Sequence, residues 1–345
     1  MVGATPEWAV AREDLEVVQP SAYAGGGGSQ ALHRVRWRGR PLLFKEYRSD
    51  VPVDGDVLER LVRWHAALGP EDARRLESGA AFPVAVVTTG DEVTGVCVPE
   101  APTPFFLTDR RGQLRPRPLD RMAMTYEHAA RVAHPHYEPP HKLAVLGHLL
   151  SLVHWLHERD LVVGDLNAEN VLVTAAVTDA RSFLLDCDSL WIGGTSPFPR
   201  HEAPTLVCPF AAGDAFTRET DLFKFAVLAL RCLNENNSDP EPHTALLAAV
   251  MPADERAALL AMREPGGAAS PQRVDSLARA WRNRVSPAGI LIGVTDERGR
   301  FPWNEPPPSA SPAGSRVVVW SAIAAVAAVL ALVAAVAFLV SSLVG

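Results

Sequence analysis

The sequence predicts an α+β fold of two lobes, a small strand-rich N-terminal lobe and a larger helical C-terminal lobe, followed by one apolar helix. Three patterns carry this prediction. The first hundred residues contain short apolar or alternating runs separated by Gly, Pro and Asp, which is typical of strands. After about residue 103, apolar residues recur at the three- and four-residue spacing of helices. Residues 317–340 form an apolar run without a charged side chain.

The N-terminal lobe is expected to span residues 15–102. Its strand candidates are short runs such as ALHRVRW, PLLFKEY, AAFPVAVVTTG and EVTGVCV. One helical segment, Val57 to Leu68, interrupts these strands and carries leucines among its apolar positions. These runs account for the β part of the predicted fold.

The C-terminal lobe is expected to span residues 103–285. His141 to Arg159 places leucines and valines at helical spacing after a Pro-Pro pair, which marks a helix start. Asp221 to Leu233 is apolar nearly all round and is therefore expected to be buried. Residues 103–140 are interpreted as an insertion without an assigned role. The cleft between a strand-rich and a helical lobe is a natural ligand site.

Composition limits the classes of partner. The chain of 345 residues has a formal net charge of −7, which gives no electrostatic basis for nucleic acid as the main partner. Its four cysteines lie far apart and form no CxxC pair. Reduced thiols are therefore expected, rather than a disulfide framework or a Cys-based zinc site. The N-terminus has acidic residues and no apolar core, which is not the pattern of a signal peptide.

The apolar run at residues 317–340 predicts a transmembrane helix, because at 1.5 Å per residue it covers about 36 Å, against roughly 30 Å of hydrocarbon. Arg316 precedes the run and no basic residue follows it, which places the preceding residues in the cytoplasm. Residues 286–316 are expected to be a Pro- and Ser-rich linker. We therefore expect a single-pass protein at the cell membrane that contacts lipid. Ala324 and Ala328 have a spacing that can pair two spans, but alanine-rich runs produce it by chance, so a homodimer is possible without being supported.

The residues that point to chemistry lie between two apolar runs. The segment VGDLNAENVLV places Asp165 and Asn170 five residues apart, and the next apolar run ends at Asp186. A carboxylate can orient an attacking hydroxyl, and carboxylate and amide oxygens can hold Mg²⁺. In spacing and order the segment resembles the eukaryotic-type protein kinase superfamily. Asp165 and Asn170 match the D-x-x-x-x-N of the catalytic loop, and Asp186 matches the Asp of D-F-G.

The resemblance covers about residues 15–285 and implies ATP and Mg²⁺ as cofactors. Gly25 and Gly27 fall in a Gly-rich turn that lets backbone N–H groups approach phosphates, although GGGGS is also a linker composition. Lys45 ends the run LLFK, as the lysine of V-A-I-K does, and would contact the α- and β-phosphates.

Three further segments take positions that the family implies. Glu59 lies on the predicted helix and is the expected partner of the site lysine, chosen over Glu71. The alternative is an i,i+4 surface pair of Glu59 with Arg63. Residues 95–100 resemble the hinge that contacts adenine through its backbone. Asp221 resembles the Asp that anchors the catalytic loop from below, and the alternative is a helix N-cap.

Several positions depart from the family pattern. Val163 and Gly164 stand where the family has His and Arg, so control through a phosphorylated activation loop is not expected. Asn167 replaces a loop lysine that often steadies the γ-phosphate. Asp188 adds a second carboxylate after Asp186 and is expected to face solvent. These departures resemble a divergent bacterial branch whose motifs read G-D-L-N-x-x-N-V-L-V and D-C-D-S.

The sequence thus predicts an ATP- and Mg-dependent protein kinase of the Ser/Thr type that acts on a protein substrate in the cytoplasm. Asp165 and Lys45 are the expected catalytic residues, and Asn170 and Asp186 the expected metal ligands. The altered motifs leave open a pseudokinase that binds nucleotide or partners without phosphotransfer. The triplet GDL also resembles the aminoglycoside kinase loop, so a small-molecule phosphotransferase is a second alternative.

Overall fold

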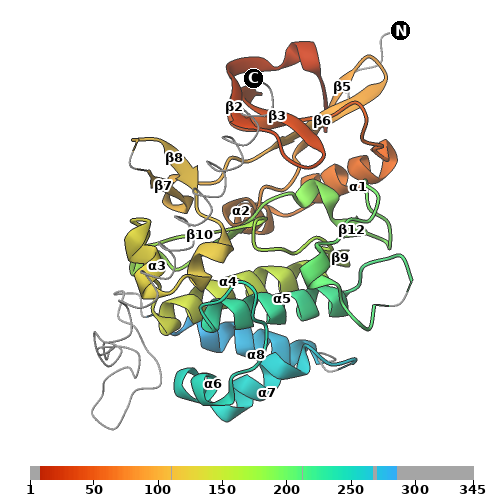
Figure 1. Ribbon diagram of the computed structural model, residues 1–345. Helices are drawn as coiled ribbons and strands as arrows, with labels where there is room; N and C mark the ends of the chain where they lie inside the picture. The colour runs from red at the N-terminus through yellow and green to blue at the C-terminus, as the bar shows by residue number, and fades with distance from the viewer. Residues whose placement is uncertain (1–7, 110, 212, 267–269, 286–345) are drawn as a thin grey trace, which may run out of the picture. The chain divides into compact units, whose positions relative to one another are not determined.

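Residues 8–109, 111–211, 213–266 and 270–285 are described by the computed structural model. The chain divides into two units, residues 1–294 and 295–345, and all described residues belong to the first. Within this unit the N-terminal strands form a sheet at one end and the longer helices gather at the other (Figure 1). The fold class is therefore α+β, with a mixed sheet.

The main sheet has six strands in the order β1-β5-β6-β4-β3-β2. Neighbouring strands are antiparallel except for β1 and β5, which run parallel. The strands are β1 (Ala9–Ala11), β2 (Glu16–Ala24), β3 (Ser29–Trp37), β4 (Arg40–Tyr47), β5 (Ala85–Thr89) and β6 (Glu92–Val98). Strand β4 thus lies inside the sheet, between β3 and β6.

Strand β4 also shows how the sheet separates two apolar clusters. Leu42 and Phe44 pack in one cluster, and Leu43 and Tyr47 pack in the other. Successive side chains of a strand point to opposite faces, so Lys45 shares the face of Leu43 and Tyr47. The run LLFKEY therefore delivers one lysine to an otherwise apolar face.

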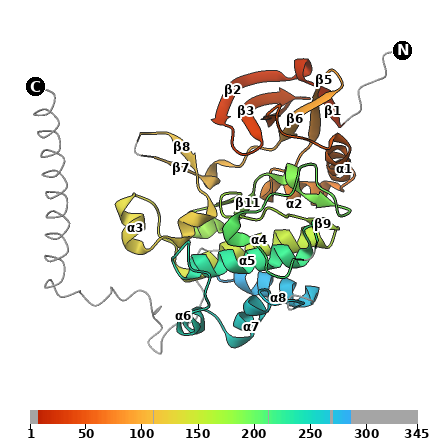
Figure 2. The ribbon, with the colours of Figure 1, turned by 45° about the vertical axis from the view of Figure 1, so that its right-hand side comes forward.

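Helices cover this face of the sheet and build the rest of the unit. The helices are α1 (Gly55–Ala66), α2 (Pro70–Gly79), α3 (Tyr126–Arg131), α4 (Pro139–His157), α5 (Arg218–Leu233), α6 (Thr244–Val250), α7 (Ala253–Ala261) and α8 (Pro271–Arg282). Helices α4 and α5 lie side by side, and α8 packs against α4 (Figure 2). Helix α2 was not predicted, because Leu76 is its only large apolar residue.

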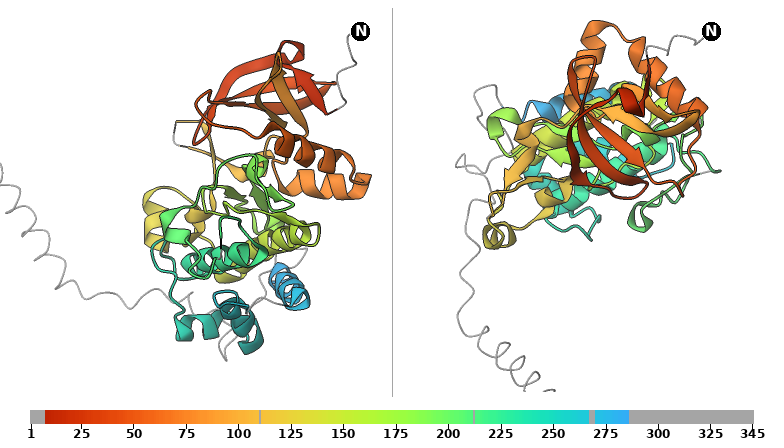
Figure 3. Two further views of the ribbon diagram at one scale, coloured as in Figure 1. Left: turned by 90° about the vertical axis from the view of Figure 1, so that its right-hand side faces the viewer. Right: turned by 90° about the horizontal axis from the view of Figure 1, so that it is seen from above.

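Three short strand pairs connect the sheet to the helices. They are β7 (Phe106–Thr108) with β8 (Leu114–Pro116), β9 (Leu161–Val162) with β12 (Trp191–Ile192), and β10 (Val171–Val173) with β11 (Ser182–Leu184). The hairpin of β7 and β8 lies within residues 103–140, the segment without an assigned role. Figure 3 shows these pairs between the sheet and the helical end.

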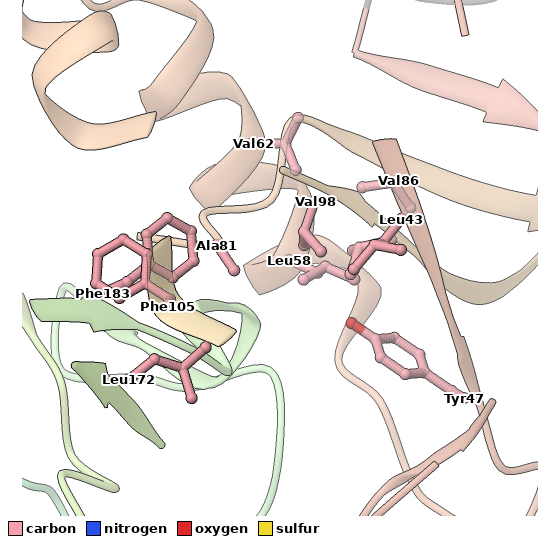
Figure 4. Packing of buried hydrophobic residues seen from close by; sticks show 11 residues of the cluster. Leu43, Tyr47, Leu58, Val62, Ala81, Val86, Val98, Phe105, Leu172 and Phe183 are labelled. Carbon is pink, nitrogen blue, oxygen red and sulfur yellow. The ribbon is translucent and has the colours of Figure 1, made fainter. Parts of the chain in front are cut away.

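One apolar cluster joins the sheet to the hairpin of β10 and β11 (Figure 4). From the sheet side it contains Leu43 of β4 and Leu58 of α1, both buried. From the other side it contains Leu172 of β10 and Phe183 of β11, and the tilted ring of Phe105 lies 5.4 Å from that of Phe183. Burial of such side chains contributes roughly 1.5–3 kcal/mol each. The cluster therefore holds the strand that carries Lys45 close to the loops that carry the acidic residues.

The prediction of a C-terminal transmembrane helix, and of a single-pass location at the cell membrane, is not supported and is corrected here. No helix among the described residues is long and apolar enough to cross a membrane. The longest of them, α4, has 19 residues, but it carries Lys142 and several histidines, and it is apolar because it packs inside the fold. Residues 286–316 and 317–340 lie outside the described residues.

Candidate functional site

A cavity of about 490 Å³ lies between the sheet and the loops that follow β9 and β11. Its apolar walls come from both sides and include Leu32, Leu43, Val98, Leu172 and Leu185. Its polar lining includes Lys45, Asp165, Asn167, Glu169, Asn170, Asp186 and Asp188. A pocket with apolar walls and a few converging charged groups suits a ligand that has one flat apolar part and one anionic part.

The loop of residues 163–170 folds on its own side chains. The Asn167 amide oxygen accepts hydrogen bonds from the backbone N–H groups of Glu169 at 2.9 Å and Asn170 at 3.0 Å. The Asn170 amide nitrogen donates to the Asp165 carboxylate at 3.1 Å and to its carbonyl oxygen at 3.2 Å. Asn and Asp favour such local bonds. Asn167 therefore shapes the loop, and Asp165 and Asn170 are in direct contact.

The second acidic segment is tied to this loop. The backbone N–H of Leu185, just after β11, donates to the carbonyl of Asn170 at 2.7 Å. Asp186 then adopts a left-handed backbone conformation, with φ of +52°. This conformation is costly for most residues and is tolerated best by Asn and Asp among those with a side chain. It begins a tight turn that carries Asp186 and Asp188 toward β4.

Lys45 meets both of these carboxylates. Its ammonium donates to Asp186 at 3.0 Å and to Asp188 at 2.8 Å. Burial acts to lower the pKa of Lys45, but the two carboxylates outweigh it and hold the pKa above its ordinary value. Lys45 is therefore a cation at neutral pH.

Asp188 is buried, and the expectation that it faces solvent was wrong. Its side chain is 1% exposed, whereas that of Asp186 is 50% exposed. The second carboxylate oxygen of Asp188 accepts a hydrogen bond from the Tyr47 hydroxyl at 2.9 Å. Burial, followed by the charge of Asp188, raises the pKa of Tyr47 well above its ordinary value. Sequence reasoning missed this contact because the partners lie 141 residues apart.

Glu59 does not hold Lys45 in this structure. It lies on α1 and pairs with Arg63, which is the surface pair that the sequence offered as the alternative. Glu71 is exposed at the start of α2. Among the ion pairs of the described residues, those of Lys45 are with Asp186 and Asp188 alone.

The Gly-rich turn connects β2 to β3 above the cavity. A side chain at Gly25 would place its Cβ 2.3 Å from backbone oxygens of Ser29 and Gln30, so only glycine fits there. Gly27 has φ of +54° and lines the cavity, as Gly26 does, whereas Gly25 is not among the lining residues. The turn therefore brings backbone to the cavity as expected for Gly27, and Gly25 shapes the turn.

The segment that resembles a hinge also borders the cavity, through Val98 and the residues that follow it, Pro99, Glu100 and Ala101. The Glu100 carboxylate accepts hydrogen bonds from Arg34 and from the Tyr23 hydroxyl, each at 2.6 Å. Burial and the Glu100 carboxylate raise the pKa of Tyr23 to about 12. Glu100 thus fixes the end of β6 to β2 and β3 at the mouth of the cavity.

Asp221 of α5 anchors the loop of residues 163–170, as predicted. Its carboxylate is fully buried and accepts hydrogen bonds from the backbone N–H groups of Val163 at 2.7 Å and Gly164 at 2.8 Å. His157, the last residue of α4, contacts the same carboxylate at 2.8 Å. The alternative, that Asp221 is a helix N-cap, does not hold, because Thr217 is the N-cap of α5.

A second residue of α5 holds the loop from the same side. The Lys224 ammonium donates to the carbonyl of Gly164 at 2.6 Å and pairs with Glu202 at 2.8 Å. Burial acts to raise the pKa of Glu202, but Lys224 and Arg200 outweigh it and lower the pKa. Sequence reasoning missed Lys224, although its place three residues after Asp221 puts both on one helix face.

Gly164 explains why the loop lacks an arginine at this position. It has φ of +74°, and a Cβ there would lie 2.7 Å from Phe216 and 2.8 Å from Trp191. A larger residue would strain the backbone and collide with both rings. The two aromatic rings, which meet edge-on with their centroids 5.6 Å apart, fill the space beside the loop.

The cavity residues fit a magnesium–nucleotide complex in type and place. No three His, Cys, Asp or Glu side chains in the described ranges are grouped so that they could hold a metal ion by themselves. Mg²⁺ at phosphate sites is commonly bound through one or two protein oxygens, with phosphate and water as the other ligands. Asp186 offers an exposed carboxylate, and Asn170 uses its amide nitrogen in the loop, which leaves its amide oxygen as a ligand.

In comparisons with known proteins, no protein-family model and no curated protein matches this chain. Membership of a family is therefore not shown. The likeness to protein kinases rests on the residues around the cavity, and function is argued below from those residues.

Proposed function

We propose that this protein is an ATP- and Mg-dependent phosphotransferase of the protein kinase type, which transfers phosphate to a Ser or Thr hydroxyl of a protein. The observation that carries the proposal is the convergence of Lys45, Asp165, Asn170 and Asp186 at one cavity whose other walls are apolar. These residues come from three separate parts of the chain. Phosphoryl transfer requires this combination of a cation, oxygen ligands for a metal and a carboxylate near the acceptor.

The apolar and polar parts of the cavity suit the two parts of a nucleotide. Leu32 and Leu43 on the sheet side and Leu172 on the other side provide surfaces for a flat base. Lys45 provides a positive charge for phosphate oxygens, and Gly27 provides backbone without a side chain. A bound Mg²⁺ would supply charge neutralisation between the phosphates, with Asn170 and Asp186 as its protein ligands.

Asp165 has the role of orienting the acceptor hydroxyl and accepting its proton. Its carboxylate oxygen Oδ2 is held by the Asn170 amide at 3.1 Å, which fixes the side chain relative to a metal ligand. Asp221 and Lys224 hold the backbone beside it from below. Such fixed placement matters, because the catalytic advantage of a positioned group depends on its geometry.

The first test is phosphate transfer by the full-length chain from γ-labelled ATP in the presence of Mg²⁺. Asp186→Ala is expected to reduce label on protein to background, because it removes the exposed carboxylate proposed to hold the metal. Asp179→Asn is the matched control, since Asp179 is an acidic residue near β11 that pairs with Arg181, away from the cavity residues.

Equal incorporation by wild type and Asp186→Ala would exclude the proposed metal site. Transfer of label to a small hydroxyl compound, with none to protein, would instead support a small-molecule phosphotransferase. The reaction products should therefore be separated by size before the label is counted.

A further inference from the structure

Lys45 takes its counter-ions from the segment that follows β11 and not from helix α1. Both Asp186 and Asp188 lie on that segment, within 3.0 Å of the ammonium. Glu59 of α1 forms an ion pair with Arg63 on the same helix. The position of the Lys45 side chain therefore depends on the segment that follows β11.

We propose that Asp188 is the positioning residue for Lys45. The inference rests on the proposed function, in which Lys45 contacts nucleotide phosphates. It concerns how that same site is held and regulated.

The two carboxylates differ in a way that divides their roles. Asp188 is 1% exposed and uses one oxygen for Lys45 and the other for Tyr47. Asp186 is half exposed and borders the cavity. If Asp186 held a metal ion, Asp188 would still hold the lysine. A buried carboxylate with both oxygens hydrogen-bonded stays with its partners, because leaving them would place an unpaired charge in the protein interior.

Tyr47 fixes Asp188 from the sheet. It lies two residues after Lys45 on the same face of β4, so both side chains reach the same carboxylate. Its ring is buried in the cluster of Figure 4 and meets Phe198 edge-on at 5.2 Å. The strand that carries the lysine thus also carries the group that holds its counter-ion.

Helix α1 supports this arrangement by packing and supplies none of the described ion pairs of Lys45. Its Leu58 lies in the same apolar cluster as Tyr47. The backbone N–H of Asp54, the N-cap of α1, donates to the carbonyl of Pro197 at 2.8 Å, one residue before the Phe198 ring that meets Tyr47. The charges that hold Lys45 therefore come from the segment after β11, and α1 packs beside the tyrosine.

The chain offers a direct readout, because its three lysines are Lys45, Lys142 and Lys224. Isotope labelling of the lysine side-chain nitrogens gives one ammonium signal for each, and NMR at one fixed neutral pH measures its chemical shift and the rate at which its protons exchange with water. The other two lysines serve as internal references, since they pair with Glu235 and Glu202, away from this site. The measurement does not require phosphotransfer.

In Asp188→Asn the ammonium of Lys45 loses one charged hydrogen-bond partner. We expect its signal to shift and its protons to exchange with water about tenfold faster or more, since a hydrogen bond to a charged group is lost. Tyr47→Phe keeps the charge of Asp188 and removes only the contact that fixes it, so the change is smaller. Glu59→Gln leaves the signal of Lys45 unchanged.

The kinetic consequence follows the same order. Asp188→Asn is expected to raise KM for ATP about tenfold or more, since it loosens a charge-assisted contact, while kcat changes less. Asp188→Glu restores the charge and part of the KM, which a purely structural role would not do.

Two results overturn the inference: an unchanged Lys45 signal in Asp188→Asn, or an equal change in Glu59→Gln. If Asp188→Asn does not fold, Tyr47→Phe gives the decision, because a Lys45 signal equal to wild type contradicts the arrangement. If wild type neither binds nor hydrolyses ATP, the proposed function fails while the Lys45 signal still tests the role of Asp188.

Discussion

Replacing Asp165 by Asn is expected to lower kcat for phosphate transfer by about 10²–10⁴-fold, the usual contribution of a positioned acid–base group. The amide keeps the size of the side chain but cannot accept the proton of the acceptor hydroxyl. The contact with Asn170 is the main one at risk, since the Asn170 amide now donates to a neutral oxygen. The dissociation constant for MgATP should therefore stay within about threefold of wild type.

The measurement is a steady-state rate with labelled ATP, together with calorimetric titration of the same preparations. Asp179→Asn is again the control for the loss of one carboxylate. A rate for Asp165→Asn within twofold of wild type would show that another group takes the proton. A parallel loss of binding and rate would assign Asp165 to nucleotide binding rather than to acceptor orientation.

Replacing Asp221 by Ala is expected to lower the free energy of unfolding by about 3–5 kcal/mol, as is typical when one member of a buried charged network is removed. The change leaves the backbone N–H groups of Val163 and Gly164 without acceptors and His157 without its partner. Because these bonds fix the loop that carries Asp165, the fraction that remains folded should also be nearly inactive.

Urea denaturation followed by circular dichroism measures the stability, and the rate assay measures the activity per folded molecule. Asp275→Ala is the control, because this residue makes only an exposed i,i+4 pair with Arg279, worth about 0.5 kcal/mol or less. If Asp221→Ala lost as little stability as Asp275→Ala, Asp221 would not anchor the loop. If folded Asp221→Ala had the activity of wild type, the loop would not depend on Asp221.

The parts of the site that sequence could predict are those with a local signature. Asp165 and Asn170 have a fixed spacing on one loop, and Asp186 ends an apolar strand, so their types and order indicate their chemistry. Lys45 stands out as the lysine that ends an apolar run. The structure places all four around one cavity.

The parts that sequence could not predict depend on contacts between distant segments. Asp188 was expected to face solvent, and nothing in the local sequence reveals that Tyr47 and Lys45 enclose it. Helical spacing could not tell whether Glu59 would meet Lys45 or Arg63, since both choices keep the same helix face. The partners of these side chains depend on which distant segments of the chain meet, and the periodicity of the sequence contains no information about that.

The membrane prediction is a separate case. The run at residues 317–340 lies outside the described residues, and no described helix has the length and hydropathy of a span. Helix α4 reaches 19 residues, but its apolar surface packs against neighbours within the fold.

The central claim is that the cavity residues still perform phosphate transfer, and its most direct test is the identity of the product. The full-length chain is incubated with MgATP and a protein acceptor, and modified residues are found by mass spectrometry while bound nucleotide is measured in parallel. We predict phosphoserine or phosphothreonine in wild type and none in Asp165→Asn, with nucleotide bound in both. Bound nucleotide without any phosphoester in wild type would contradict the claim and identify a protein that binds ATP without using it.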